Sequence, residues 1–232
     1  MSKKIIVFTG AGISAESGLG TFRDTKGIWA KFRIEDVCTP EAWAKNPEKC
    51  VEFYNLRRRE ALAAVPNQAH LAITRLQEVF PNTHVITQNI DNLHERAGNK
   101  NILHLHGEIT KLRSQKNVHD LVDLEGWEQH YGEKHPDGSI LRPHIVFFGE
   151  DVPNFPAACE LASQADIMIV VGTSLNVYPA ASLLMYAPLH AEIYLVDPNE
   201  PDLRYYGDRI GYIGAKATEG LPALVEELII NS

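Results

Sequence analysis

The chain has 232 residues, of which 44% are hydrophobic and 22% are charged, a balance ordinary for a folded domain with a sizeable core. Its 30 acidic side chains outnumber 22 basic ones and give a net charge of -8, which argues against nucleic acid or an anionic membrane as a partner. The three cysteines form no C-x-x-C pair, which excludes a cysteine zinc site and a disulfide framework. The N-terminal MSKKIIVFTG resembles neither a secretory leader nor a membrane span, so we expect a cytoplasmic protein.

Short apolar runs predict buried parallel strands in chain order at residues 5–8, 84–87, 102–105, 166–171 and 192–196. Between them, Thr-Pro, Asn-Pro and Pro-Asn pairs are helix-start signals that predict helices over 40–45, 47–64 and 67–80. Strands that alternate with helices are typical of an α/β fold with a doubly wound, mostly parallel, Rossmann-like sheet.

Two segments do not follow this alternation. Residues 19–36 contain glycines and are expected to form a cofactor loop, and the polar residues 111–142 are expected to form a small inserted module.

The segment GAGISA, which follows the first strand, matches the G-x-G-x-x-G/A pattern of a phosphate-binding turn. A dehydrogenase would continue with a full helix and a second strand that ends in an acidic residue about 20 residues on. Here Gly18 and Gly20 interrupt the helix, and the acidic pair at 35–36 lies in no predicted strand. Dinucleotide binding is therefore expected without hydride transfer, and Phe22 and Arg23 suit a loop that shields and cleaves the dinucleotide.

Polar clusters follow three of the predicted strands. They are TQNIDNLH (87–94), LHGE (105–108) and VGTSLNVYPA (171–180). Since open α/β sheets bind ligands beyond the carboxyl ends of their strands, these clusters predict one site.

The segments GAGISAESGLGTFRD, TQNIDNLHERAG, LHLHGE, LRPHIVFFGE and GTSLNVYPAA occur in this order. With them the chain resembles the sirtuin family of NAD-dependent protein-lysine deacylases, which transfer the acyl group from lysine to ADP-ribose and release nicotinamide. A mono-ADP-ribosyltransferase that uses the same NAD cleavage is the main alternative. The expected partners are proteins or peptides with succinyl-, malonyl- or acetyl-lysine. The sequence does not determine the oligomeric state and is compatible with a monomer.

The resemblance implies a single catalytic domain over 1–232. Residues 1–35, 84–110 and 143–232 would form the Rossmann-like NAD-binding part, 36–83 a helical insertion, and 111–142 the small module.

For chemistry, the resemblance assigns His106 as general base, while His104 is expected to be a core histidine bonded to backbone. Asn89 and Asp91 would hold the nicotinamide ribose and carboxamide, although residues of these types also cap helices after a strand. The full expected cofactor set is Gly10, Ala11, Gly12, Ile13, Phe22, Arg23, Gln88, Asn89, Asp91, Gly172, Thr173, Ser174, Asn199 and Ala217, with Asp197 competing for the role of Asn199.

For the substrate, the resemblance implies an extended peptide clamped by strand addition between VFFGE and SLNVYP. The implied contacts are Val146, Phe147, Gly149, Glu150, Asn176 and Val177.

Tyr54 and Arg57 stand three residues apart on one helical face, where a guanidinium and a phenol fit a carboxylate. The pair matches the Y-x-x-R signature of the sirtuin branch that removes succinyl and malonyl groups. The alternative is an ordinary exposed ion pair of Arg57 with Glu60. Ile34, in a loop expected to face the acyl tunnel, allows acetyl-lysine as a second substrate.

Most sirtuins bind zinc through two C-x-x-C pairs that are missing from residues 111–142. The spacing of His119, Asp120, Asp123, His130 and His135 matches no standard structural zinc pattern, so no metal is expected. Trp127, Tyr131 and Leu121 or Leu124 are the candidates for a miniature core in its place.

Overall fold

A computed structural model describes residues 3–20, 32–173, 175, 178–199 and 209–232. Its main sheet has six parallel strands in the order β3-β2-β1-β7-β8-β9. The strands are β1 (Ile5–Thr9), β2 (Thr83–Thr87), β3 (Ile102–His104), β7 (Ile167–Val171), β8 (Glu192–Val196) and β9 (Ile210–Ile213). The expected doubly wound α/β fold and its five strands are confirmed, and β9 is an addition. The strand order reverses between β1 and β7, where such sheets bind ligands.

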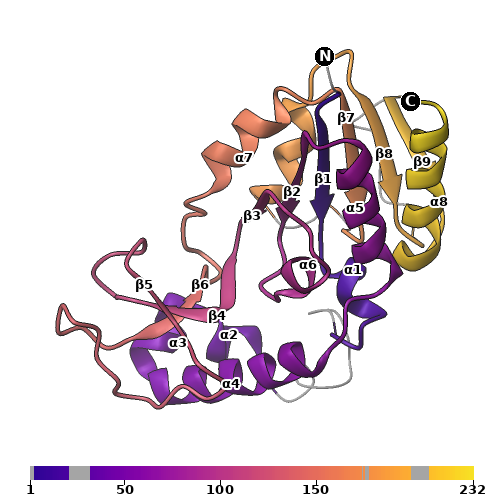
Figure 1. Cartoon of the computed structure of the whole chain (residues 1–232). Helices are drawn as coiled ribbons and strands as arrows, with labels where there is room; N and C mark the ends of the chain where they lie inside the picture. The colour runs from indigo at the N-terminus through magenta and orange to yellow at the C-terminus, as the bar shows by residue number, and fades with distance from the viewer. Residues whose placement is uncertain (1–2, 21–31, 174, 176–177, 200–208) are drawn as a thin grey trace.

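Helices cover both faces of this sheet (Figure 1). One face packs against α5 (Gln68–Val79) and α8 (Ala217–Ile230), in a cluster that includes Ile73, Leu76 and Leu224. The other face packs against α7 (Phe155–Ala162) and the 3-10 helix η2 (Ala180–Tyr186). Two short helices, α1 (Gly12–Ala15) and α6 (Leu93–Arg96), follow β1 and β2. Within the described ranges, no helix is long and apolar enough to traverse a membrane.

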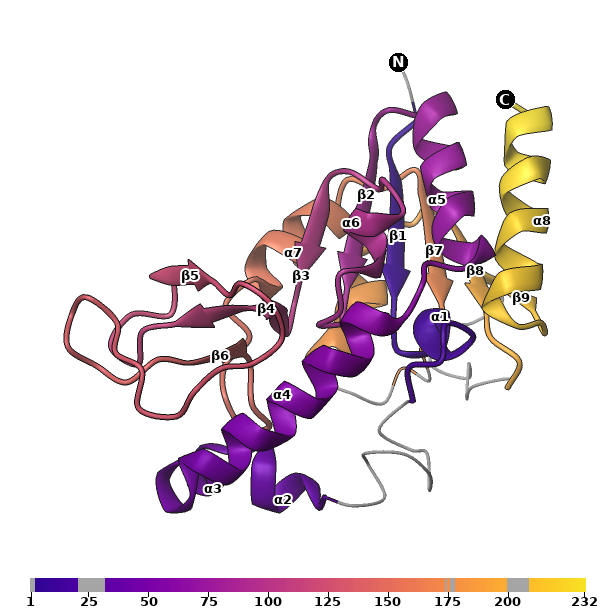
Figure 2. The ribbon, with the colours of Figure 1, turned by 60° about the horizontal axis from the view of Figure 1, so that its bottom comes forward.

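A second lobe projects from one side of the sheet (Figures 1 and 2). It contains α2 (Ile34–Val37), α3 (Pro40–Lys45), α4 (Pro47–Ala63) and an antiparallel sheet of β4 (Gly107–Arg113), β5 (Leu121–Asp123) and β6 (Arg142–Ile145) in the order β5-β4-β6. The helix-start signals act as expected, since Thr39 Oγ1 accepts from Ala42 N at 3.1 Å and Asn46 Oδ1 accepts from Lys49 N at 3.0 Å.

The boundaries between these parts differ from the expected ones. Helix α5 lies on the main sheet, so the helical insertion is shorter than residues 36–83. Strand β4 begins at Gly107, so the small module starts before residue 111 and includes residues 107–110, which were expected to belong to the Rossmann-like part. Ile34 starts α2 and packs against the cluster of Phe53 and Phe147, and it does not line the cavity described below.

Polar contacts hold the small module together, and the prediction of a miniature apolar core is wrong. Leu121, Trp127 and Tyr131 are 38%, 36% and 44% exposed. The buried Arg58 of α4 instead donates to the carbonyls of Ile109 (2.5 Å) and Trp127 (2.8 Å). Buried carbonyls need such donors, so the guanidinium ties the module to α4.

A second polar group closes the far end of the module. The Asp137 carboxylate accepts hydrogen bonds from the Ser114 hydroxyl and from Ser139 N (2.8 Å) and Oγ (2.6 Å), and these bonds lower the pKa of Asp137. The ring nitrogens of the buried His135 lie 3.2 Å from Asp137 Oδ1 and 3.3 Å from Asp120 Oδ1. These donors and acceptors satisfy one another and residues 111–142 contain no cysteine, so this part of the module does not fit a structural zinc ion.

Replacing Arg58 by methionine should lower the free energy of unfolding by about 2–3 kcal/mol, because the buried Ile109 carbonyl and the partly buried Trp127 carbonyl lose a charged donor. The neighbouring Arg59 lies exposed over the Trp127 ring at 5.5 Å, and Arg59→Met should cost less than about 1 kcal/mol. Urea denaturation of both variants measures the difference. Equal losses would contradict the role given to Arg58.

Removing metal should leave the protein unchanged, because side-chain hydrogen bonds close the module. We expect the same melting temperature before and after dialysis against EDTA. A fall that added zinc restores would show a metal requirement.

Candidate active site

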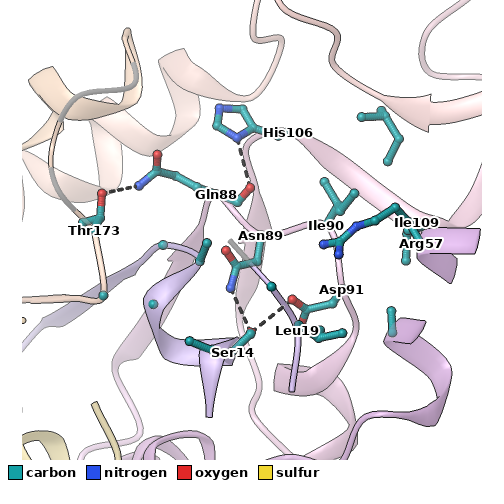
Figure 3. A pocket seen from close by; sticks show the side chains of 18 of the residues that line it. Ser14, Leu19, Arg57, Gln88, Asn89, Ile90, Asp91, His106, Ile109 and Thr173 are labelled. Atoms are coloured by element: carbon teal, nitrogen blue, oxygen red, sulfur yellow. Dashed lines mark hydrogen bonds between the residues drawn. The ribbon is translucent and has the colours of Figure 1, made fainter. Parts of the chain in front are cut away.

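A cavity of about 820 Å³ lies between the carboxyl edge of the main sheet and the second lobe. Its volume is in the usual range for small-molecule sites. Polar clusters from three strand ends meet there, as expected (Figure 3). Of the expected cofactor residues it is lined by Gly10, Ala11, Gly12, Gln88, Asn89, Asp91, Gly172, Thr173, Asn199 and Ala217, together with Asp197.

Glycines form the floor of the cavity because two loops touch there through their backbones. Gly12 N donates to Gly172 O at 2.8 Å, and a Cβ on Gly12 would lie 2.6 Å from Gly172 Cα. Gly172 has φ +61°, and a Cβ on it would lie 2.4 Å from Ile13 N. Both glycines are therefore required for the contact between the two loops, and this turn enters the cavity wall without bulky side chains. Ile13 differs from the expectation, since its side chain is buried in the core and does not line the cavity.

Asn89 and Asp91 are joined through Ser14, which the sequence reasoning missed. Asn89 Nδ2 donates to Ser14 Oγ at 3.1 Å, and Ser14 Oγ donates to Asp91 Oδ2 at 3.1 Å (Figure 3). Asp91 Oδ1 accepts from the backbone N–H of Leu93, the first residue of α6, at 3.1 Å. Asp91 thus has the structural role as well as a place in the cavity wall. The signal for Ser14 was its position inside the phosphate-binding turn.

His106 lines the cavity, and a backbone carbonyl fixes the tautomer of its ring. Its Nδ1 is 3.0 Å from Gln88 O, and a carbonyl only accepts, so Nδ1 carries the proton and Nε2 is the basic atom (Figure 3). Burial lowers the pKa of His106 below its usual value, against the opposing effect of the Gln88 carbonyl. The ring is therefore neutral near pH 7, as a general base must be.

His104 is buried and bonded to backbone, as expected. Its Nδ1 lies 2.9 Å from Asn89 O and its Nε2 lies 2.8 Å from Glu95 Oε1.

The segment after β6 forms the wall beside His106. Val146 N donates to His106 O at 3.0 Å, and both Val146 and Gly149 line the cavity. The Glu150 carboxylate accepts from Arg142 at 2.8 Å, Arg113 at 3.3 Å and Phe147 N at 2.8 Å. Glu150 therefore anchors this segment, and it also lines the cavity, so the substrate contact expected for it stays a prediction.

Tyr54 and Arg57 both line the cavity from α4. The Tyr54 ring is buried and stacks on Phe147 with centroids 5.8 Å apart, and its hydroxyl donates to Cys38 Sγ at 3.4 Å. Arg57 Nη1 donates to Glu60 Oε2 at 3.1 Å, so the alternative ion pair is formed. The Arg57 side chain is only 12% exposed, however, so the pair is not the exposed surface ion pair that the alternative described.

Five expected site residues lie outside the described residues. They are Phe22, Arg23, Ser174, Asn176 and Val177.

The fold and the cavity define an α/β protein that binds a dinucleotide at the switch point of its sheet, beside a neutral imidazole. The Sir2 family model matches residues 10–179. An NAD-dependent protein deacylase of Bacteroides thetaiotaomicron is 47% identical over 98% of both chains. The structure of a Sir2 homolog-NAD complex aligns over 99% of this chain and 90% of that one, with 36% identity and a TM-score of 0.89. A Sir2 complex with a p53 peptide and NAD+ aligns over 99% and 95%, with 30% identity and a TM-score of 0.82. The chain belongs to the Sir2 family.

Proposed function

We propose that this chain removes succinyl, malonyl and related acidic acyl groups from protein lysines and also accepts acetyl-lysine. The broader activity, NAD-dependent protein deacylation, is that of its Sir2 relatives, and the cavity fits it. The complex of a Sir2 protein with a peptide and NAD+ supports a peptide as the second ligand.

NAD supplies a ribose carbon whose bond to nicotinamide breaks as the acyl oxygen attacks it. The residues of the chain bind and orient the reactants. The turn at Gly10–Gly12, which lines the cavity and carries no side chain at either glycine, would leave room for the pyrophosphate. Asn89 and Asp91, which line the cavity, would hold the nicotinamide end, and His106 Nε2 would take a ribose hydroxyl proton.

The acidic acyl preference depends on the place of Arg57 in the cavity wall. A guanidinium has five N–H donors in a fixed fork, and the bond to Glu60 involves Nη1. A terminal carboxylate of the acyl group would replace or share this bond and would gain a charge-assisted contact. Ile109 and Ile90 line the same cavity and would pack on the methylene groups of the acyl chain.

An assay with matched peptides tests the proposal. Succinyl-, malonyl- and acetyl-lysine forms of one peptide are incubated with the protein and NAD, and nicotinamide and deacylated peptide are measured together. We expect all three to react and the two acidic forms to have the higher kcat/KM. Nicotinamide release without deacylated peptide would instead favour ADP-ribosyl transfer.

A further inference from the structure

Asn89 is held at three of its polar groups. Its side-chain amide donates to Ser14 Oγ, and its backbone N–H donates to Thr87 Oγ1 at 3.0 Å. Its carbonyl oxygen lies 2.9 Å from His104 Nδ1. The first contact belongs to the cavity wall and the second to the end of β2, but the third reaches out of the cavity to a buried ring.

The ring of His104 connects Asn89 to a charge on another element. Its Nε2 lies 2.8 Å from Glu95 Oε1 of α6. The His104 side chain is 8% exposed, whereas that of Glu95 is 40% exposed. One face of the contact is therefore in the protein interior and the other is open to solvent.

We propose that Glu95 and His104 form a positioning pair, in which a His104 imidazolium donates one proton to Glu95 and the other to the Asn89 carbonyl and so fixes Asn89 for the cofactor. This inference rests on the assignment of Asn89 to the cofactor site. Neither residue lines the cavity, so both act through Asn89.

The tautomers of the ring explain why the charge matters. Both neighbours of the ring, a carbonyl and a carboxylate, are acceptors, and only the imidazolium offers a donor to each. When the ring loses a proton, the remaining one stays on Nε2, because the ionised carboxylate is the stronger acceptor. The Nδ1 lone pair then faces the Asn89 carbonyl, and the contact becomes repulsive.

The surroundings of His104 favour the charged form. Burial lowers its pKa, but the hydrogen bond and charge of Glu95, the Asn89 carbonyl and the charge of Glu108 together raise it above its usual value. The imidazoles of His94 and His144 also interact electrostatically with the His104 ring. Glu108 is itself paired with Lys111 at 2.9 Å, so Glu95 is the main partner.

The dependence of the KM for NAD on pH tests the pair, with acetyl-lysine peptide as fixed substrate. In the wild type the KM should rise about five-fold as pH rises through the raised pKa of His104, since one hydrogen bond to Asn89 is lost. In Glu95→Gln this rise should disappear, because a glutamine amide donates to Nε2 and leaves the proton on Nδ1. Glu108→Gln is the matched control and should keep the rise, moved to lower pH.

The same rise in KM in wild type and Glu95→Gln would overturn the proposal. If Glu95→Gln does not fold, the ¹⁵N chemical shifts of the His104 ring, measured by NMR in the wild-type protein, test whether this ring is charged. We expect both ring nitrogens to be protonated near pH 6.5, about the pKa of an unperturbed histidine, and a ring that is mostly neutral there would overturn the proposal. These shifts need no turnover, so they separate this inference from the proposed function, which is tested by the rates on succinyl-, malonyl- and acetyl-lysine peptides.

Discussion

Replacing His106 by asparagine should lower kcat for deacylation by about 10²–10⁴-fold, the usual contribution of a general base. Asparagine can keep the contact with Gln88 O but has no basic nitrogen in place of Nε2. The expected loss is therefore chemical, with the KM for NAD nearly unchanged. Steady-state kinetics with acetyl- and succinyl-lysine peptides should show the same loss for both.

The pH profile and a second histidine provide the controls for His106. A base must be neutral, and burial lowers the pKa of His106, so wild-type kcat should fall only on the acid side, below the usual histidine pKa of about 6.5. His84 lies on β2 three residues before Thr87 and does not line the cavity, and His84→Asn should keep the wild-type profile. An acid limb that persists in residual His106→Asn activity would assign the base to another group.

Buried strands were the most predictable part of the fold. All five residues of β1 and of β7 are buried, so the sequence has continuous apolar runs at residues 5–8 and 167–171. Strand β9 contains Gly211 and is only partly buried, and β5 is mostly exposed. Such strands have a weak hydrophobic pattern, and only the pairing with β8 or β4 reveals them.

The predictable part of the site is the set of residues that directly follow strands of the main sheet. The carboxyl edge of a parallel sheet brings separate motifs together, and the clusters that contain Asn89, His106 and Gly172 were predicted in this way to share one site. The roles of the single residues came from the family resemblance. Contacts between side chains of distant segments have no such signature. The bond from Ser14 to Asp91 and the bonds of Arg142 and Arg113 to Glu150 depend on tertiary packing alone.

The ion pair of Arg57 with Glu60 has two consequences for substrate choice. Glu60 stabilises the guanidinium charge in a cavity wall that is largely shielded from water. It also competes with a substrate carboxylate for the same donors. An acidic acyl group therefore binds only if its contacts exceed those of Glu60, whose side chain is 39% exposed and can turn to solvent.

Replacing Arg57 by methionine should lower kcat/KM for succinyl- and malonyl-lysine peptides by roughly ten-fold or more, since a charge-assisted contact contributes about 1.5–3 kcal/mol. The acetyl group carries no carboxylate, so kcat/KM for the acetyl-lysine peptide should change little. Arg59→Met controls for charge, because Arg59 is exposed on the same helix. Glu60→Gln should lower the KM for the succinyl peptide, as the competing carboxylate is lost. An equal fall for succinyl- and acetyl-lysine peptides in Arg57→Met would mean that Arg57 maintains the cavity and does not recognise the acyl carboxylate.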